Sequence, residues 1–206
     1  PGGASFKLLP LLAKKSGVDY AAIDVLNLAP NLQEQMLLQG QVDVIAIFTA
    51  TSYMNLVALK LDPDKDFRWI YYSDAGLDLY SNGVMVSPKL AKEKPEAVKS
   101  LVRAINRAMR EVLAEPDAAI DLLAKKEPLI NKAIEKQRLA YVTRTLIATP
   151  EAVELGVGDV GDGRMNEAIE AIVAAFELPK KPAANDVFSR SFLPPRSERA
   201  FAKAGN

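Results

Sequence analysis

The hydrophobic pattern divides the chain into a first half with short apolar runs and a second half with helical spacing. In the first half, short runs that are apolar or alternate with polar residues predict strands. These runs lie at residues 23–28, 42–48, 67–72 and 83–87. Between them, helical spacing predicts helices at residues 5–16, 31–39 and 51–61. Because the 42–48 run is almost wholly apolar, we expect it to be a central strand of a parallel sheet, within an α/β fold.

Beyond Pro88 the apolar residues recur every three or four positions, which predicts a helical second half. Helices are expected at residues 93–114, 116–126, 130–147 and 164–176. The proline-rich tail from Pro179 is expected to be extended and to cover a surface. Residues 73–88 interleave polar and aromatic side chains around two glycines and predict a crossover. We therefore divide the chain into an α/β lobe at residues 1–75 and a mainly helical part at residues 76–206.

Composition limits the chemistry that this chain can perform. The 26 basic and 26 acidic residues balance, which argues against nucleic acid as the main partner because phosphate binding normally needs a basic excess. The chain has no cysteine and no histidine, so thiolate metal sites, cysteine nucleophiles and serine–histidine hydrolysis are excluded. No apolar run reaches the roughly 20 residues that span a bilayer. We predict no enzymatic activity, no cofactor and no metal site.

Two stretches place small polar residues at the start of an expected helix. In GGAS, the backbone N–H groups and the serine hydroxyl can bind an anionic group, with Gly3, Ala4 and Ser5 as contacts. Alternatively, Ser5 is an ordinary N-cap, and Pro10 then predicts a kink or a late start. The stretch FTATSY follows the 42–48 run, and ligands of open α/β sheets bind outside the carboxyl ends of strands. There a small polar ligand is one interpretation, and helix capping with tyrosine packing is the other.

The densest aromatic and acidic cluster lies around the expected crossover. Its members are Tyr71, Tyr72, Asp74, Asp78 and Tyr80. Aromatic rings with a few fixed polar groups hold small heteroaromatic or cationic ligands, although half-buried strand tyrosines beside solvated aspartates would give the same pattern. The glycine-rich stretch LGVGDVGDGR at residues 155–164 fits neither a phosphate loop nor a calcium loop, and we interpret it as a connecting loop.

Several of these stretches together resemble the solute-binding proteins of ABC importers, in the branch often called NMT1/THI5-like. This branch includes binders of nitrate, sulfonates, taurine and the thiamine pyrimidine precursor. The resemblance is carried by GGASFKLLP, QEQMLLQGQVDVIAIFTATSYMNL, SDAGLDLYSNGVMVSPKLAKEKPEAVKSLVRAINRA, EPDAAIDLLAKKEPLI and FSRSFLPP. It implies a type II periplasmic-binding fold, in which two α/β lobes close on a small ligand that is then delivered to a membrane permease.

On that template the chain begins in the second lobe and lacks the first part of the first lobe. We therefore expect a fragment that binds ligand weakly by itself and associates with itself through exposed apolar surface. The resemblance implies a periplasmic or otherwise extracytoplasmic location, free or lipid-anchored, with a targeting signal outside this chain. It implies ligand contacts at Gly3, Ala4, Ser5, Thr49, Thr51, Ser52, Tyr53, Asp74, Asp78 and Tyr80.

The acidic pair Asp74 and Asp78 bears on the choice of ligand. Two carboxylates repel nitrate or a sulfonate unless cations offset them, so they favour a ligand with N–H donors, such as a small nitrogen heterocycle. Two other functions stay open. One is a pyrimidine-precursor synthase of the same superfamily, against which the absence of histidine counts. The other is the effector-binding domain of a LysR-type regulator, which the helical second half does not suit.

Overall fold

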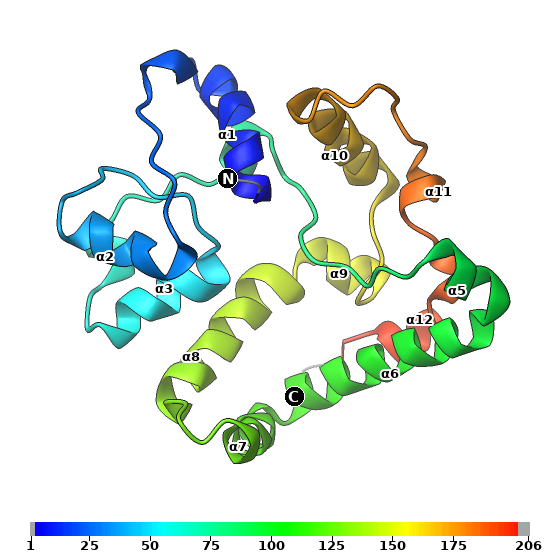
Figure 1. The fold of residues 1–206 in the computed structure, drawn as a ribbon. Helices are drawn as coiled ribbons and strands as arrows, with labels where there is room; N and C mark the ends of the chain where they lie inside the picture. Colours follow the sequence, from blue (N-terminus) through cyan, green and yellow to red (C-terminus); the bar gives the residue numbers. More distant parts are fainter. Residues whose placement is uncertain (1–2, 202–206) are drawn as a thin grey trace. The chain divides into compact units, whose positions relative to one another are not determined.

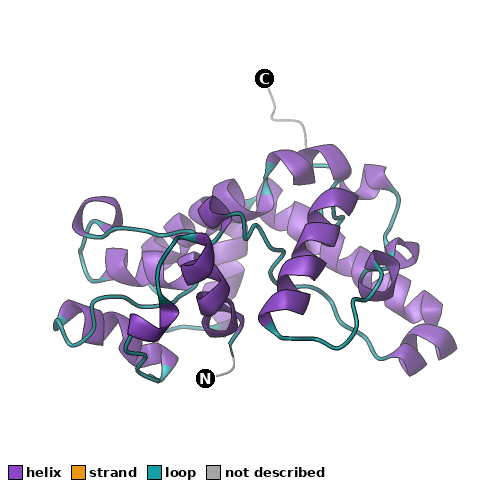
Figure 2. Ribbon diagram, turned by 90° about the horizontal axis from the view of Figure 1, so that it is seen from above, coloured by secondary structure: helices purple, strands orange, loops and turns teal. Residues whose placement is uncertain are grey.

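The computed structural model describes residues 3–201, and within this range the chain is helical (Figures 1 and 2). Extended segments and turns join the helices, and none of the residues 3–201 lies in a β-strand. The chain divides into two compact units. Unit 1 runs up to Leu79 and includes Glu167–Lys181, and unit 2 contains Tyr80–Asn166 and the residues from Pro182 onward.

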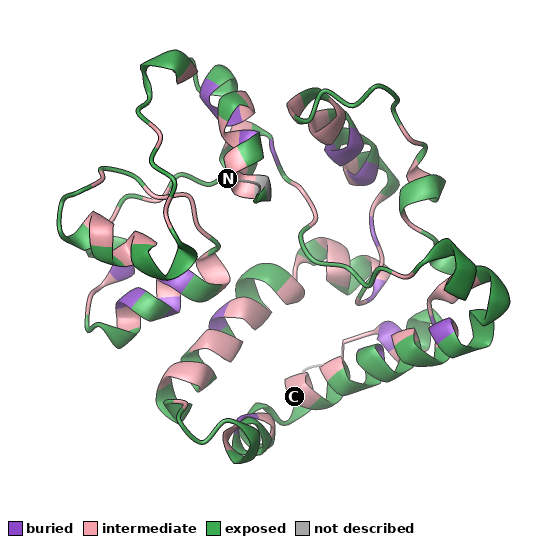
Figure 3. Cartoon of the chain, viewed as in Figure 1, coloured by how far each residue is buried: buried purple, intermediate pink, exposed green. Residues whose placement is uncertain are grey.

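Unit 1 contains α-helices and short 3₁₀ turns that are separated by long extended segments. Its elements are α1 (Ala4–Lys15), η1 (Tyr20–Ala22), η2 (Pro30–Leu32), α2 (Gln33–Leu38), α3 (Thr49–Ala58), α4 (Pro63–Asp66), η3 (Ser73–Ala75) and most of α10 (Asp162–Ala175). Its buried apolar side chains are Leu8, Leu12, Ala13, Met54, Leu56, Leu77, Ala168 and Ile169. Because α1 and α3 supply most of these side chains, the two helices form the best-packed parts of the unit (Figure 3).

Unit 2 consists of longer helices connected by short turns. Its elements are α5 (Pro88–Glu93), α6 (Pro95–Ala114), α7 (Pro116–Lys126), α8 (Lys132–Val142), the π-helical turn η4 (Thr143–Ile147), α9 (Pro150–Leu155), the start of α10, α11 (Ala184–Val187), η5 (Arg190–Phe192) and α12 (Arg196–Arg199). The central helix α6 contacts α5, α7, η5 and α12. The C-terminal segment is thus packed on α6.

Proline and a polar cap define several helix starts. Asp62, Ser87 and Thr149 each precede a proline, and each side chain accepts a backbone N–H from the first turn of α4, α5 or α9. Proline suits the first helical position because its missing N–H would lack a partner there anyway. Helices α6 and α7 also begin at prolines. These helix starts are therefore encoded locally.

The predicted parallel sheet of an α/β periplasmic-binding fold is wrong for this structure. The four predicted strand segments are not β-strands, and the structure forms no β-ladder in the described range. Val44, Ile70 and Met85, which belong to these segments, are 73%, 61% and 95% exposed. An apolar run favours extended backbone, but a strand also needs a neighbouring strand for its N–H and C=O groups. The structure provides no such neighbour in this range.

The helix predictions agree better with the structure. The helices expected in the second half correspond to α6, α7, α8 with η4, and α10. Of the connecting loop expected at residues 155–164, residues 156–161 lie between α9 and α10. In α1 the N-cap is Gly3, so Ser5 does not cap the helix, and Pro10 lies inside a helix that starts early. The tail contains α11, η5 and α12, so the expectation of a wholly extended tail is wrong. Helices α4, α5 and α9 were not predicted.

One face of α6 is incompletely covered (Figure 3). Val98 on this face is buried, whereas Leu101 and Ile105, three and seven positions further, are 48% and 40% exposed. Residues at these spacings share one side of a helix. The apolar stripe that the sequence predicts is therefore present, but Leu101 and Ile105 leave part of it exposed.

Candidate functional site

The first group of predicted contacts lies at the start of α1. Gly3 has an extended backbone and its carbonyl accepts the N–H of Lys7 at 3.2 Å. The Ser5 carbonyl accepts a hydrogen bond from the Tyr72 hydroxyl at 2.8 Å. Burial raises the pKa of Tyr72, so this phenol stays protonated and can donate. Gly2 of the GGAS stretch and the side chain of Ala4 lie outside the described part of the structure.

The segment after Tyr72 contains the predicted acidic pair and passes near the end of α1. Asp74 and Asp78 are exposed and flank a turn at Gly76, whose φ is +72°. A Cβ on Gly76 would lie 3.6 Å from the ammonium nitrogen of Lys15, near the end of α1. The side chain of Leu77 is buried and anchors the turn. The two carboxylates therefore belong to a turn that also has a lysine ammonium beside it.

The second group of predicted contacts forms the first turn of α3. Thr49 begins the helix, and the Thr51 hydroxyl donates to the Phe48 carbonyl at 2.9 Å. Ser52 is buried and forms a hydrogen bond with the carboxylate of Glu34, which also accepts from Asn55 at 3.1 Å. Burial raises the pKa of Glu34, but these hydrogen bonds outweigh it and hold the pKa below its usual value. Ser52 thus connects α3 to α2.

Tyr53, the last residue of this group, lies near Trp69 and Tyr71. The sequence analysis did not predict that these three residues lie together. We call Tyr53, Trp69 and Tyr71 the aromatic row. The ring centroids of Tyr53 and Trp69 are 5.7 Å apart, and those of Trp69 and Tyr71 are 6.2 Å apart. Trp69 and Tyr71 are two positions apart in an extended segment, which places both side chains on one side. The spacing of Trp69 and Tyr71 could be recognised in the sequence, whereas the contact of Tyr53 with Trp69 could not.

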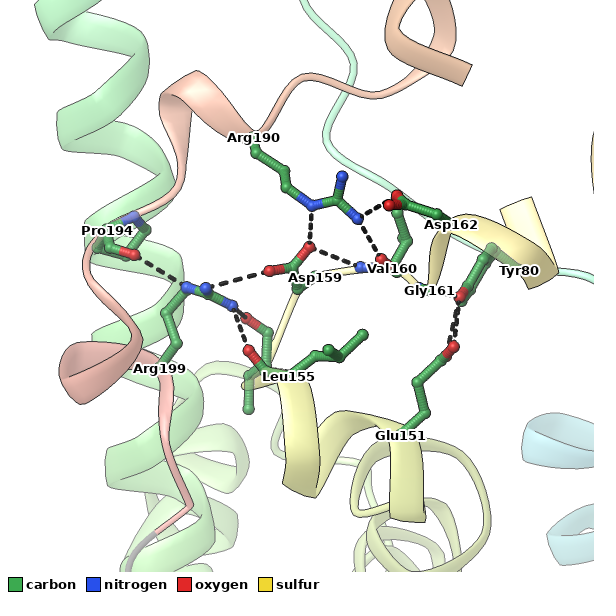
Figure 4. A network of polar contacts seen from close by, with 11 residues as sticks. Tyr80, Glu151, Leu155, Asp159, Val160, Gly161, Asp162, Arg190, Pro194 and Arg199 are labelled. Atoms are coloured by element: carbon green, nitrogen blue, oxygen red, sulfur yellow. Dashed lines mark hydrogen bonds and ion pairs between the residues drawn. The ribbon is translucent and has the colours of Figure 1, made fainter. Parts of the chain in front are cut away.

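Tyr80, the remaining predicted contact, belongs to unit 2 and lies in a polar network (Figure 4). Its hydroxyl donates to the Glu151 carboxylate, at 2.8 and 2.9 Å from the two oxygens, and accepts the Gly161 N–H at 2.7 Å. Arg164 pairs with Glu151 at 2.9 Å and lies 4.2 Å above the Tyr80 ring. Burial and the hydrogen bond to Glu151 raise the pKa of Tyr80. These contacts connect the predicted crossover to the glycine-rich loop.

The same loop holds the C-terminal segment through two arginines (Figure 4). Asp159 accepts from Arg190 at 2.8 Å and from Arg199 at 3.2 Å. Arg199 is buried and also donates to the carbonyls of Pro194, Leu155 and Val157. Burial raises the pKa of Asp159, but the hydrogen bonds from Arg190 and Val160 outweigh it and lower the pKa overall. Every donor and acceptor named here is matched, so the network is structural.

Three further features of the described residues bear on function. None of the helices within residues 3–201 combines the length and the apolar character needed to cross a bilayer. Acidic side chains in the same range do not gather in a group that could hold a metal ion. An open hollow at the junction of α7 and α8 contains none of the predicted contacts and is lined by Asp121, Ala124, Lys125, Pro128, Ile130 and Lys132.

Comparison with protein-family models gives a match to the NMT1/THI5-like family over residues 1–119, more than half of the chain. The chain belongs to the NMT1/THI5-like family. A search of curated proteins found no match. All ten predicted ligand contacts of this NMT1/THI5-like chain, from Gly3 to Tyr80, lie within the matched range.

The structure brings the predicted contacts together in local groups. Ser5 and the segment toward Asp74 are connected through Tyr72, and Thr49 to Tyr53 share one helical turn. These groups belong to unit 1, whereas Tyr80 belongs to unit 2. Unit 1 therefore carries nine of the ten predicted contacts, together with the aromatic row, and it is the candidate ligand-binding part of the chain.

Proposed function

We propose that this NMT1/THI5-like chain is the solute-binding component of an ABC importer, which binds a small polar molecule and delivers it to a membrane permease. The family match over residues 1–119 carries the proposal, because the matched range contains every residue assigned to ligand contact. The proposed role is that of a receptor without catalytic activity. It places the protein outside the cytoplasm, where such receptors meet their ligands.

We further propose that the ligand is a nitrogen heterocycle rather than a simple anion. Asp74 and Asp78 supply two exposed carboxylates on one turn, and Asp64 supplies another beside Tyr53. Carboxylates accept N–H donors and repel anions of the nitrate or sulfonate type. Lys15, beside Gly76, offers one balancing cation near the turn. Carboxylates therefore predominate, which supports a ligand that brings its own N–H groups.

A mass measurement tests the receptor role directly. Native mass spectrometry of gently purified protein should show an added mass of a few hundred daltons that is absent under denaturing conditions. The unfolding temperature, measured without a fluorescent dye in the presence of 4-amino-5-hydroxymethyl-2-methylpyrimidine, then tests the ligand class. A ligand at 100 times its Kd stabilises the folded state by about 2.7 kcal/mol and so raises this temperature. Taurine and nitrate serve as the anionic comparison. Stabilisation by taurine or nitrate alone would contradict the heterocycle assignment.

A second copy of the chain is the partner that we propose for the exposed stripe of α6. Leu101 and Ile105 continue the face of the buried Val98, so two such helices can cover each other without any new pocket. Isologous contacts of this kind are the commonest route to homodimers. A concentration-dependent mass in light scattering after size-exclusion chromatography would support the dimer, and a strictly monomeric chain would contradict it.

A further inference from the structure

Two of the three rings of the aromatic row are held in place by hydrogen bonds at their polar edges. The Tyr53 hydroxyl donates to the Asp64 carboxylate at 2.6 Å, and the Trp69 indole N–H donates to the Pro63 carbonyl at 2.9 Å. Because Pro63 and Asp64 are consecutive residues of α4, two rings from distant parts of the chain are attached to the same turn. Their orientations are therefore set before any ligand arrives, which lowers the entropy cost of binding.

One ring of the row, that of Tyr71, is partly exposed to solvent. Trp69 and Tyr71 are nearly parallel, with an angle of 12° between their planes, and Tyr71 is 39% exposed. Both side chains leave one side of the extended segment that follows α4, drawn in cyan in Figure 1. Two near-parallel rings, of which Trp69 is attached at its edge to Pro63 and Tyr71 is partly exposed, form a stacking surface for a flat molecule.

The charges beside the row select among flat molecules. Helix α4 and its N-cap Asp62 carry three carboxylates, with Asp64 and Asp66, against one cation, Lys65. Asp62 pairs with Lys65 at 2.6 Å, and Asp66 accepts the Asp62 N–H at 2.8 Å, so these two carboxylates are engaged within the turn. Asp64 is exposed, and a carboxylate that accepts one phenol retains capacity for further donors. A ring with N–H donors or positive charge is favoured there over an anionic ring.

We propose that the aromatic row is a binding surface for a planar, nitrogen-containing ring, which stacks on Trp69 and Tyr71 and directs its N–H donors toward Asp64. This inference rests on the proposed role as a small-molecule receptor and assigns the ring of the ligand to particular side chains. Trp69, which is absent from the predicted contacts, becomes the central contact. It is also the only tryptophan of the chain, so indole fluorescence reports on this surface alone.

The experiment is a titration of the whole chain, followed by Trp69 fluorescence and by calorimetry, with 4-aminopyrimidine and with pyrimidine-4-carboxylate. The two probes share a ring and differ in offering N–H donors or a negative charge. We expect the amine to quench Trp69 and to bind at least fivefold more tightly than the carboxylate. Tyr71→Leu should weaken amine binding by about 5- to 150-fold, the range found when one stacking side chain is removed. Asp64→Asn should reduce the preference for the amine.

Matched variants of the same unit control for nonspecific effects. Tyr20→Leu removes a tyrosine outside the row, and Asp24→Asn removes an exposed aspartate on another segment. Both should leave the affinity for the amine unchanged. Retained helical circular dichroism of every variant establishes that it is folded, and Trp69→Leu, followed by calorimetry alone, gives a second test of the stacking contact.

Each outcome decides between the two proposals. Binding of the amine that Tyr71→Leu and Trp69→Leu both leave unchanged would overturn the assignment to the aromatic row and leave the receptor role standing. Absence of amine binding, with a different small molecule carried in native mass spectrometry, would do the same. Absence of any bound molecule in either experiment would overturn both. Loss of affinity in the row variants alone supports both.

Discussion

Removing the side chain of Asp159 should destabilise unit 2 substantially. Its carboxylate is 12% exposed and accepts from Arg190, Arg199 and the Val160 N–H, at 2.8, 3.2 and 2.9 Å. Asp159→Ala leaves the Arg199 side chain, which is 7% exposed, without a carboxylate. Removing one partner of a buried ion pair costs about 3–5 kcal/mol. Arg199 keeps three backbone carbonyls and Arg190 is partly solvated, so we expect about 3 kcal/mol, at the low end.

Asp162→Ala is the matched control for this prediction. Asp162 also pairs with Arg190 at 2.8 Å, but its side chain is 77% exposed. Exposed pairs contribute about 0–1 kcal/mol, so the control should cost about 1 kcal/mol or less. Both carboxylates thus share the partner Arg190, and they differ in burial, in the contacts of Asp159 with Arg199 and the Val160 N–H, and in the position of Asp162 at the start of α10.

Urea unfolding followed by far-ultraviolet circular dichroism measures both variants. Unit 2 holds the longest helices, so the helical signal reports on it, whereas Trp69 fluorescence of the native protein checks that unit 1 is intact. With a urea dependence of about 1–3 kcal/mol per molar, a loss of 3 kcal/mol lowers the midpoint by about 1–3 M. Equal, small effects of Asp159→Ala and Asp162→Ala would refute the reasoning that burial and Arg199 make the difference.

Four further predictions follow from other contacts. Stability should fall as the pH drops through the lowered pKa of Asp159, because the ionised carboxylate contributes its full stabilisation only above the unfolded pKa of about 3.9. Urea midpoints between about pH 3 and 7 should therefore change less with pH in Asp159→Ala than in the unmodified chain. An equal change of the midpoint with pH in both proteins would contradict this. Tyr80→Phe should lower the free energy of unfolding by about 1–2 kcal/mol, because it leaves the Gly161 N–H without its acceptor. The same urea experiment measures this loss, and an unchanged midpoint would show that the hydrogen bond is dispensable. Gly76→Ala should cost about 1 kcal/mol at φ +72°, whereas Gly83→Ala, with open space and no positive φ, should be neutral in thermal unfolding. Leu101→Lys should abolish dimer formation in light scattering, while Lys99→Ala should not; a persistent dimer in Leu101→Lys would place the interface elsewhere.

The helices and the family could be predicted because their signals are local in sequence. Helices α6 and α7, expected at residues 93–114 and 116–126, begin at Pro95 and Pro116, whereas α4, α5 and α9 also begin at prolines but were not predicted. The apolar spacing from Val98 to Leu113 likewise predicts α6 without knowledge of any other element. The family signal is also carried by the order of residues, since the match over residues 1–119 does not depend on the fold.

Only the tertiary structure decided which extended segments find partners and which side chains meet. The run at residues 42–48 has the composition of a buried strand, yet pairing requires a second strand at the right distance, and the structure provides none in the described range. Tyr53 joins Trp69 because α4 binds both ring edges, and Asp159 meets Arg199 across 40 positions of sequence. Such contacts depend on how distant segments pack, whereas propensity and periodicity report only on neighbours along the chain.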